Sequence, residues 1–410
     1  MHGSYFEYFI SHDVETPVAK KCLVSLFIFV RGATDMLFKQ SAEVLWILKS
    51  QFISHLADSL NTFQYSFFCQ FDNPALDIFL CSFSCFLLYQ VSEIIRRETC
   101  LVCKILKKMP EGIHSIIADI NDEEAVAKAI VSEHYDVVAQ FIGYTAEDVK
   151  RDIRLFQNKT RQYIFISSAS AYQKPLADYR ITESTPLVNP YWQYSRNKIE
   201  AEEVLMAAYR TNGFPVTIVR PSHTYNGTKP PVSVHGDKGN WQILKRILEG
   251  KPVIIPGDGS SLWTLTHSKD FAKGYVGLMA NPHAIGNAFH ITIDESMTWN
   301  QIYQTIADAL GKPLNALHVA SDFLAKHSDH YDFRGELLGD KAATVVFDNS
   351  KIKRLVPDFI CNTSMADGLR QAVHYMLSHP ESQIPDPEFD SWCDRIANAI
   401  SAADKAFELS

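Results

Sequence analysis

The sequence of 410 residues is long enough for two domains, or for one large α/β domain with a smaller lobe, and its 46% hydrophobic content can supply a full core. The formal net charge of −8 gives no basic face for a nucleic-acid backbone, so no nucleic-acid partner is expected. The eight cysteines have no regular spacing and include one lone CxxC, Cys100 to Cys103, so we expect reduced thiols and no metal site.

The first residues, MHGSYFEYFISHDVE, are acidic and aromatic, whereas a secretory signal carries positive charge before an apolar run. Two apolar runs follow, at residues 22–30 and 75–91. The second is at the lower length limit for a membrane span and has Asp77 near its start, which favours a buried helix or an irregular segment. We therefore expect a cytoplasmic protein without a membrane partner.

The composition changes near residue 108. Before that point glycine occurs only at Gly3 and Gly32, six of the eight cysteines are present, and phenylalanine is abundant without a period of 2 or 3.6. We expect residues 1–108 to be an atypical or poorly ordered N-terminal segment.

From residue 109 onward, short apolar runs alternate with helical patterns. Strands are predicted near residues 115–118 and at 136–142, 163–167 and 216–220, and helices at 122–134, 146–157 and 194–210. Strands separated by helices of about ten or more residues are typical of a parallel sheet with helices on both faces. The sequence therefore predicts an α/β fold for residues 109–225, a Rossmann-like doubly wound parallel sheet.

The remainder of the chain mixes helical and strand patterns. Helices are predicted at residues 240–250, 271–280, 299–311 and 365–377. We expect residues 226–380 to form a smaller mixed α/β substrate lobe, interleaved with the last strands of the sheet, and residues 381–410 to form a helical tail. Open parallel sheets bind ligands at the carboxyl ends of their strands, so the segments after AQFI, FIS and IVRPS are the places to look for a site.

Hydroxyl side chains follow one predicted strand, at Ser167, Ser168 and Ser170, and a helix further on places Tyr194 and Lys198 on one face. A phenol is a poor base at neutral pH, and a nearby ammonium favours the phenolate. We expect Lys198 to lower the pKa of Tyr194 and Ser168 to hydrogen-bond a substrate oxygen. Tyr194 would then move a proton while a nicotinamide ring takes or gives hydride. The alternative is a solvated Tyr–Lys pair, since YxxxK can arise by chance.

Residues 109–378 resemble the extended short-chain dehydrogenase/reductase family, the NAD-dependent epimerases and dehydratases. The resemblance rests on an ordered set of segments: IIADIND, DVVAQFIG, IFISSASAY, YWQYSRNKIEAE, VRPSHTYNG, PGDGSSLWTLTHSKDFAKG and DNSKIKRLVPDF. It implies an enzyme that uses NAD or NADP. It also implies these roles: catalysis for Ser168, Tyr194 and Lys198, nicotinamide ribose binding for Lys198 as well, contact with the adenine for Asp119 and Ile120, and contact with the nicotinamide for Pro221 and Ser222.

The Gly-rich turn that holds a pyrophosphate in such folds is not recognisable. In the nearest candidate, LFIFVRGATDMLF, Gly32 can stand for the first glycine, but Asp35 and Phe38 occupy the second and third positions. The next predicted strand, LVCKIL, follows after roughly seventy residues, where about thirty are usual. Either residues 1–108 contain a rebuilt cofactor site, or they replace the first Gly-rich βα unit and impair cofactor binding.

The substrate side also departs from the family pattern. After GDG the family has an arginine that holds substrate phosphates, whereas this chain has Trp263, and an aromatic ring cannot replace a bidentate guanidinium. A nucleotide sugar is therefore in doubt, and Trp263 is either a stacking surface for another substrate or core. With Trp263, Ser170 and Asn226 are candidate substrate contacts. No Asp–Glu pair follows Ser168, which counts against a sugar 4,6-dehydratase.

Three functions remain open. The first is an NAD(P)-dependent oxidoreductase or epimerase acting on a hydroxyl or carbonyl of a sugar-like small molecule. The second is RNA binding, because residues 251–274 also resemble the chloroplast stem-loop-binding proteins, and the third is a non-catalytic sensor or scaffold. A homodimer is possible through the helix that carries YxxxK, although the same apolar residues can face the sheet.

Overall fold

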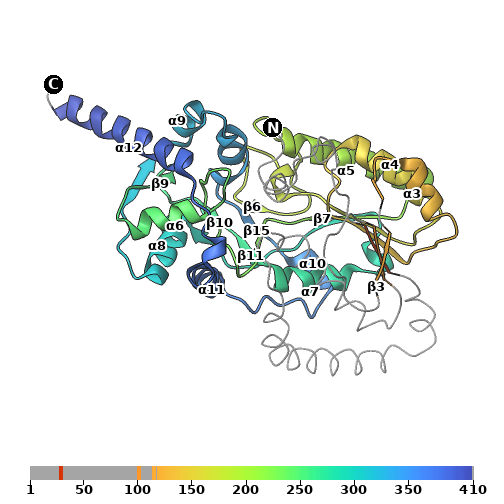
Figure 1. The fold of residues 1–410 in the computed structure, drawn as a ribbon. Coiled ribbons are helices and arrows are strands. Elements are labelled where there is room, and N and C mark those ends of the chain that lie inside the picture. The colour runs from red at the N-terminus through yellow and green to blue at the C-terminus, as the bar shows by residue number, and fades with distance from the viewer. Residues whose placement is uncertain (1–26, 31–98, 103–112, 117, 409–410) are drawn as a thin grey trace.

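The computed structural model describes residues 27–30, 99–102, 113–116 and 118–408. Figure 1 shows an α/β body with helices on both sides of a central sheet, and a second lobe beside it. Most of residues 1–108, including Gly32, Asp35, Phe38 and the apolar run 75–91, lie outside the described residues, so the expectations for them remain predictions.

A seven-stranded sheet forms the centre of the body. In the order of hydrogen bonding its strands are β12 (Asn287–His290), β7 (Val216–Arg220), β5 (Tyr163–Ile166), β4 (Val137–Gln140), β1 (Phe27–Val30), β2 (Thr99–Val102) and β3 (Ile113–Ile116). Every neighbouring pair is parallel except the two that include β1. This is the strand order of a doubly wound sheet, so the predicted Rossmann-like fold is confirmed.

The direction of β1 departs from the predicted parallel sheet. Its register with β4 pairs Phe27 with Gln140 and Val30 with Val137, so β1 ends at the edge where the other six strands begin. The physical reason that the sequence does not reveal this is the composition of the strand, FIFV, which is apolar throughout and carries no alternation to fix an orientation. In a doubly wound sheet the chain leaving this central strand meets the cofactor, and here it leaves at the opposite edge.

Helices cover both faces of the sheet (Figure 1). On one face lie α3 (Glu123–Ala129), α4 (Ala146–Phe156) and α5 (Gln193–Asn212), and on the other α7 (Ser268–Leu278) and α10 (Ser350–Leu355). Alternate residues of β4 enter opposite cores: Val138 packs with the α3, α4 and α5 side chains, and Val137 and Ala139 with those of α7 and α10. All four residues of β4 are therefore buried, as expected for a strand covered on both faces.

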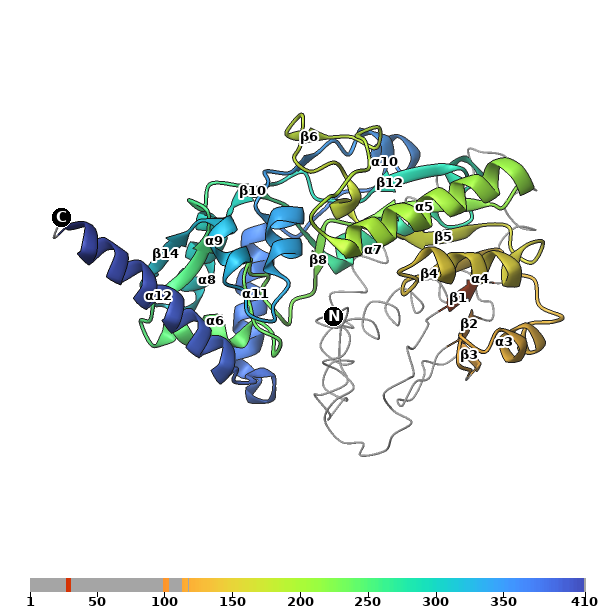
Figure 2. The same ribbon diagram turned by 90° about the horizontal axis from the view of Figure 1, so that it is seen from above.

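The second lobe has its own core. Its main elements are α6 (Trp241–Leu248), β9 (Val253–Pro256), α8 (Trp299–Leu310), β14 (Ala316–Val319), α9 (Ser321–Lys326), α11 (Met365–Ser378) and α12 (Pro387–Glu408). The tail expected at 381–410 is largely α12, which buries Phe389 and Trp392 against this lobe before its last turns run away from the body (Figures 1 and 2). The segment boundaries expected from the sequence remain predictions.

The remaining elements of the described part are short. They are β8 (His223–Tyr225) parallel to β11 (Leu265–His267), β6 (Arg180–Ile181) parallel to β15 (Val346–Phe347), β10 (Leu262–Trp263) antiparallel to β13 (Met297–Thr298), the 3₁₀ helices η5 (Ala169–Ala171), η6 (Pro282–Ala284) and η8 (Pro380–Ser382), and the π-helix η7 (Arg334–Lys341). None of the helices in the described part of the chain has the length and apolar content to cross a membrane.

Candidate active site

The carboxyl end of β5 runs into a short network of hydroxyl groups. Ser168 caps η5, and its Oγ lies 2.9 Å from the Oγ of Ser170 and accepts a hydrogen bond from the Ser170 backbone N–H. Ser195 donates to Ser170 Oγ across 2.7 Å. Ser170 was expected to contact substrate, but its side chain is buried and shared between two serines. In this structure the Ser170 hydroxyl lies between those of Ser168 and Ser195, and its contact with substrate remains a prediction.

Lys198 lies at the carboxyl edge of the sheet, one helical turn after Tyr194 on α5. Its Nζ donates to the backbone carbonyls of Gly143, at 2.6 Å, and Ile166, at 2.8 Å, which follow or end β4 and β5. The side chain is buried, and burial lowers the pKa of Lys198 to about 7. Two carbonyl oxygens therefore hold the ammonium of Lys198, while its burial disfavours the charged form.

Tyr194 has the opposite shift from the one expected. Burial raises the pKa of Tyr194 to about 12, although the interaction with the Ser168 hydroxyl lowers it in part. In the chain without cofactor, desolvation thus outweighs any lowering of the Tyr194 pKa by Lys198, and the expected effect of Lys198 remains a prediction. The physical reason is that both groups are desolvated, and Lys198 Nζ lies 5.8 Å from the Tyr194 ring while bonded to carbonyls.

Aromatic rings surround the Tyr–Lys pair. The Tyr194 ring centroid lies 4.9 Å from that of Trp192 and 6.3 Å from that of Tyr144, and Lys198 Nζ lies 4.8 Å from the centre of the Tyr144 ring. These rings exclude water from the pair, which accounts for the two pKa shifts.

Asn189 is a site residue that sequence reasoning missed. Its side-chain N–H₂ donates to the carbonyl of Ser170 at 2.8 Å and to that of Gly339 at 2.7 Å, and its Oδ1 accepts from the backbone N–H groups of Tyr191 and Trp192. Asn189 therefore joins the serine loop, the start of α5 and the π-helix η7. The only sequence signal was its place just before the YxxxK helix, because its partner Gly339 is 150 residues away.

The segment expected beside the nicotinamide lies next to the serine loop. The Pro221 carbonyl, just after β7, accepts a hydrogen bond of 2.9 Å from the Ala169 backbone N–H. Ser222 Oγ donates to the Thr264 carbonyl at 3.2 Å. Pro221 and Ser222 thus adjoin the Ser168 loop at the same edge of the sheet, and their contact with the nicotinamide remains a prediction.

Asp119 and Ile120 lie in the turn after β3, also at the carboxyl edge. Asp119 is exposed, and its Oδ1 accepts from the Asn121 backbone N–H at 2.9 Å, whereas Ile120 is buried in the core under α3. Their location suits the edge of an adenine site, and contact with the adenine remains a prediction.

Trp263 and Asn226 make their described contacts with residues other than Tyr194. Trp263 is 2% exposed, stacks on Trp299 with ring centroids 5.4 Å apart and donates its indole N–H to His223 Nδ1. Asn226 Oδ1 accepts from the backbone N–H and hydroxyl of Thr228, closing a local turn. The core alternative weighed for Trp263 matches its burial, and Asn226 is used by its own loop.

One end of NAD fits the described residues. Lys198 Nζ uses two of its three N–H groups on carbonyls, which leaves one for a ribose hydroxyl. Ser167 Oγ, at the end of β5, is buried without a hydrogen-bond partner in the described part of the chain. At the pyrophosphate end we assign no contact, because the residues that flank β1 lie outside the described part of the chain.

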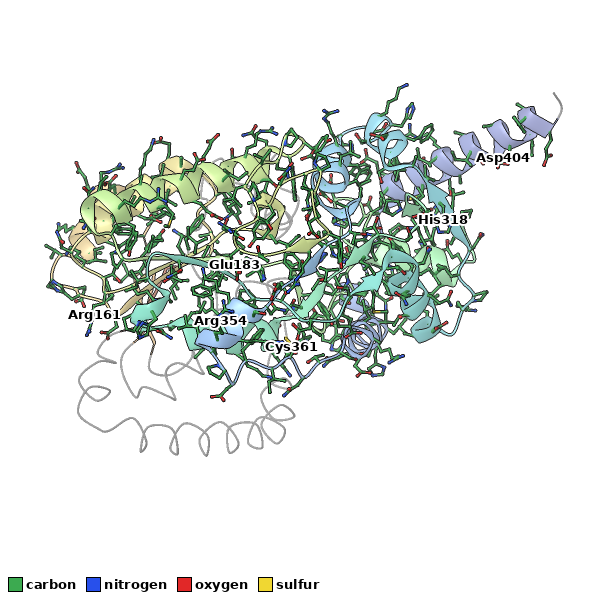
Figure 3. The ribbon with its side chains drawn as sticks, turned by 180° about the vertical axis from the view of Figure 1, so that it is seen from behind. Arg161, Glu183, His318, Arg354, Cys361 and Asp404 are labelled. Carbon is green, nitrogen blue, oxygen red and sulfur yellow. The ribbon has the colours of Figure 1, made fainter. Side chains whose placement is uncertain are left out.

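A surface pocket of about 490 Å³ lies away from these residues, between the sheet and the second lobe. Its lining includes Asp294, Glu295, Lys353 and Cys361, the last of which is labelled in Figure 3. Burial raises the pKa of the Cys361 thiol to about 12, so this cysteine is not a reactive thiolate.

A doubly wound parallel sheet that carries a serine and a Tyr–Lys pair at its carboxyl edge places the chain among the Rossmann-like α/β proteins. Residues 87–293, half of the chain, match the NAD dependent epimerase/dehydratase family, and the chain belongs to that family. The prediction of an epimerase/dehydratase-type enzyme is confirmed at the level of the family. The match begins earlier than residue 109, where the resemblance was expected to start.

Individual relatives are distant. The chain is 25% identical over 251 residues to 2'-dehydrokanamycin reductase of Streptomyces kanamyceticus, covering 61% of this chain and 69% of that protein. It is 27% identical to a chloroplast stem-loop binding protein of 41 kDa of Arabidopsis thaliana, covering 48% of each. A solved epimerase, Mth375 of Methanothermobacter thermautotrophicus, superposes with a TM-score of 0.58 at 14% identity, covering 73% of this chain and 90% of that one, which supports the fold alone.

Proposed function

We propose that this chain is an NAD(P)-dependent oxidoreductase or epimerase that acts on a hydroxyl or carbonyl of a sugar-like small molecule. The observation that carries the proposal is the grouping of Ser168, Tyr194 and Lys198 at the carboxyl ends of β4 and β5, where a doubly wound sheet binds its ligand.

The residues would divide the chemistry between them. Bound NAD(P) would supply or accept the hydride. Ser168 would hydrogen-bond the substrate oxygen, and Lys198 would hold the nicotinamide ribose with its free N–H. A phenol with a pKa of about 12 is protonated at neutral pH, so Tyr194 can donate its proton to a substrate oxygen as a carbonyl is reduced. The reductase name of the Streptomyces relative agrees with that direction.

The substrate class follows from the position of Trp263. A guanidinium is absent where the family holds substrate phosphates, and the buried indole offers no donors beyond its bond to His223. A sugar-like compound without a nucleotide diphosphate is therefore the substrate we favour.

The test is a titration of the full chain with NADH and with NADPH, followed by nicotinamide fluorescence. We expect a dissociation constant of about micromolar order for one of them, within the usual range for enzyme ligands. Keto forms of aminoglycosides and of nucleotide sugars are then screened for consumption of the reduced nicotinamide. Absence of binding by both dinucleotides contradicts the proposal and favours the third candidate, a non-catalytic scaffold, for which the reversed β1 is the supporting observation.

RNA binding is the second candidate, supported by the similarity to the chloroplast protein. The net charge of −8 and the retained Tyr194 and Lys198 weigh against it. Fluorescence anisotropy with a stem-loop RNA decides the matter. Tight binding that weakens steeply with salt supports RNA, whereas a flat response at protein concentrations that saturate with NADH supports the enzyme.

A further inference from the structure

The π-helix η7 contributes to two ion pairs that differ in the distance between their charged atoms. Lys341 and Glu336 form a buried pair with Nζ and Oε2 2.8 Å apart. In the other pair, Lys174 Nζ and Asp340 Oδ1 are 3.9 Å apart, beyond hydrogen-bond distance. The first pair is complete, and the second leaves a gap between its charged atoms.

The gap leaves a buried ammonium without an acceptor. The Lys174 side chain is 1% exposed, and its Nζ has no hydrogen-bond partner in the described part of the chain. Burial accordingly lowers the pKa of Lys174. An ammonium with three donors and no acceptor costs free energy, so this position favours a ligand that supplies an oxygen.

The Asp340 carboxylate lies on the other side of the gap from Lys174 and is in contact with solvent. Its side chain is 20% exposed, although burial raises the pKa of Asp340 to about 6. A ligand that enters from solvent can therefore reach Asp340 first and Lys174 behind it.

The pair lies beside the catalytic residues. Gly339, the neighbour of Asp340, accepts the hydrogen bond from Asn189, whose other N–H holds the carbonyl of Ser170. Glycines let η7 approach the start of α5, because a Cβ at Gly335 would lie 2.1 Å from Trp192. The Asp340 carboxylate is also near enough to raise the pKa of Tyr194. A π-helix at this place fits the frequent use of such turns at functional sites.

We propose that Lys174 and Asp340 form a subsite for a second hydroxyl group of the substrate, next to the carbon that reacts at Tyr194. A hydroxyl oxygen placed about 2.8 Å from each atom can accept from Lys174 Nζ and donate to Asp340 Oδ1, which closes the gap of 3.9 Å. This inference rests on the proposed function, and it deepens it by naming a neutral polyhydroxylated compound as the substrate class.

A charged substrate group fits less well. A phosphate or carboxylate on Lys174 would face the Asp340 carboxylate across the same gap, and an ammonium on Asp340 would face Lys174. A hydroxyl is both donor and acceptor and meets no like charge at either side.

The first arm of the test needs no substrate. The variants Lys174→Met and Lys341→Met are unfolded with urea in the absence of ligand. Lys174→Met is expected to keep or raise the unfolding midpoint, because it removes an unsatisfied ammonium, whereas Lys341→Met lowers it by leaving Glu336 buried and unpaired. A loss for Lys174→Met as large as that for Lys341→Met makes Lys174–Asp340 a structural pair and overturns the inference.

The second arm measures binding to the NADH-saturated protein. The probes are three neutral polyhydroxylated compounds, glucose, maltose and myo-inositol, each with its monodeoxy analogues. For the probe that binds best, loss of one hydroxyl is expected to weaken binding about 10- to 100-fold in the unsubstituted protein, and to add no further weakening in Lys174→Met or Asp340→Asn. Lys353→Met, in an exposed ion pair, is the control and is expected to keep the full response to each analogue.

Equal responses of the variants and the unsubstituted protein to every analogue overturn the inference, as does a failure of all three probes to bind. Neither result decides the proposed function, which stands or falls with NADH binding and with carbonyl reduction in the wider screen.

Discussion

The closed polar networks around the sheet and the proposed catalytic residues at its carboxyl edge are built in different ways. In the networks, Arg220 at the end of β7 forms a bidentate pair with Glu202 of α5, and Asp152 accepts hydrogen bonds from Gln140 and Tyr163. At the edge, no carboxylate of the described residues forms an ion pair with the buried Lys198, and Tyr194 is desolvated. The difference teaches that closed networks hold this fold, while the reacting groups are kept in unfavourable surroundings.

The largest expected effect is on turnover. Tyr194→Phe removes the proton donor and is expected to lower carbonyl reduction by about 10²- to 10⁴-fold, the usual contribution of general acid catalysis. NADH binding should change by less than about threefold, because the ring and its contacts with Trp192 and Tyr144 remain. Rates with the best substrate of the screen and fluorescence titration measure the two quantities. A variant that keeps more than a tenth of the rate would show that another group donates the proton.

Breaking the closed network is expected to cost stability. Arg220→Met leaves Glu202 buried without its partner, and we expect a loss of about 3–5 kcal/mol in unfolding free energy. The double variant Arg220→Met/Glu202→Leu should recover most of this loss. The control is Lys150→Met, in an exposed pair with Glu147, with an expected loss below about 1 kcal/mol. Similar losses for Arg220→Met and Lys150→Met in urea unfolding contradict the comparison.

Asn189 connects the Ser168 loop with η7 through its hydrogen bonds. Aspartate has nearly the same shape as asparagine, so a substitution can change the hydrogen-bonding groups alone. Asn189→Asp replaces two buried N–H donors with a carboxylate oxygen facing the Ser170 and Gly339 carbonyls, and should cost about 2–4 kcal/mol in unfolding free energy. Asn287→Asp is the matched control, since Asn287 also donates to two carbonyls but at 3.3 Å and near the surface. Its expected loss is below about 1 kcal/mol. Equal losses in urea unfolding would assign no special role to Asn189.

The smallest expected effect is a pH dependence of stability. The pKa of Lys198 is about 7 in the folded chain and 10.5 without burial, so between these values the unfolded chain binds a proton that the folded chain does not. Stability therefore rises with pH in this window, by up to about 2 kcal/mol between pH 7 and 9. Lys198→Met should remove this part of the rise, and Lys150→Met should not. Unfolding free energies of the three proteins at the two pH values provide the measurement.

The sheet could be predicted from the sequence because its strands and helices differ in period. YIFI and VVAQ, set between amphipathic helices, gave β5 and β4 and with them the edge that carries Ser168 and Lys198. The direction of β1 could not be predicted, since FIFV is apolar on both faces. The pKa shift of Tyr194 was missed because spacing along α5 says nothing about the desolvation of its side chains.

The contacts of the second lobe with the site were beyond sequence reasoning for another reason. Lys174 precedes the YxxxK helix, whereas Asp340 lies far along the chain in η7, so no periodicity connects them. The burial of Trp263 could not be predicted from its position in the family pattern. A residue at a position where the family binds ligand can pack in the core when it is apolar, as Trp263 does.

The hydrogen bonds of Asn189 also bear on the order in which parts of the protein fold. Its bonds to Ser170 and to the start of α5 join neighbours in the chain, whereas its bond to Gly339 spans 150 residues. Local contacts form before distant ones, because closing a long loop costs more chain entropy. The α5 helix can thus dock on the sheet early, but the geometry around Ser168 is completed only when η7 arrives. During synthesis, the contact that completes this geometry can form only after η7, which ends at Lys341, has been made.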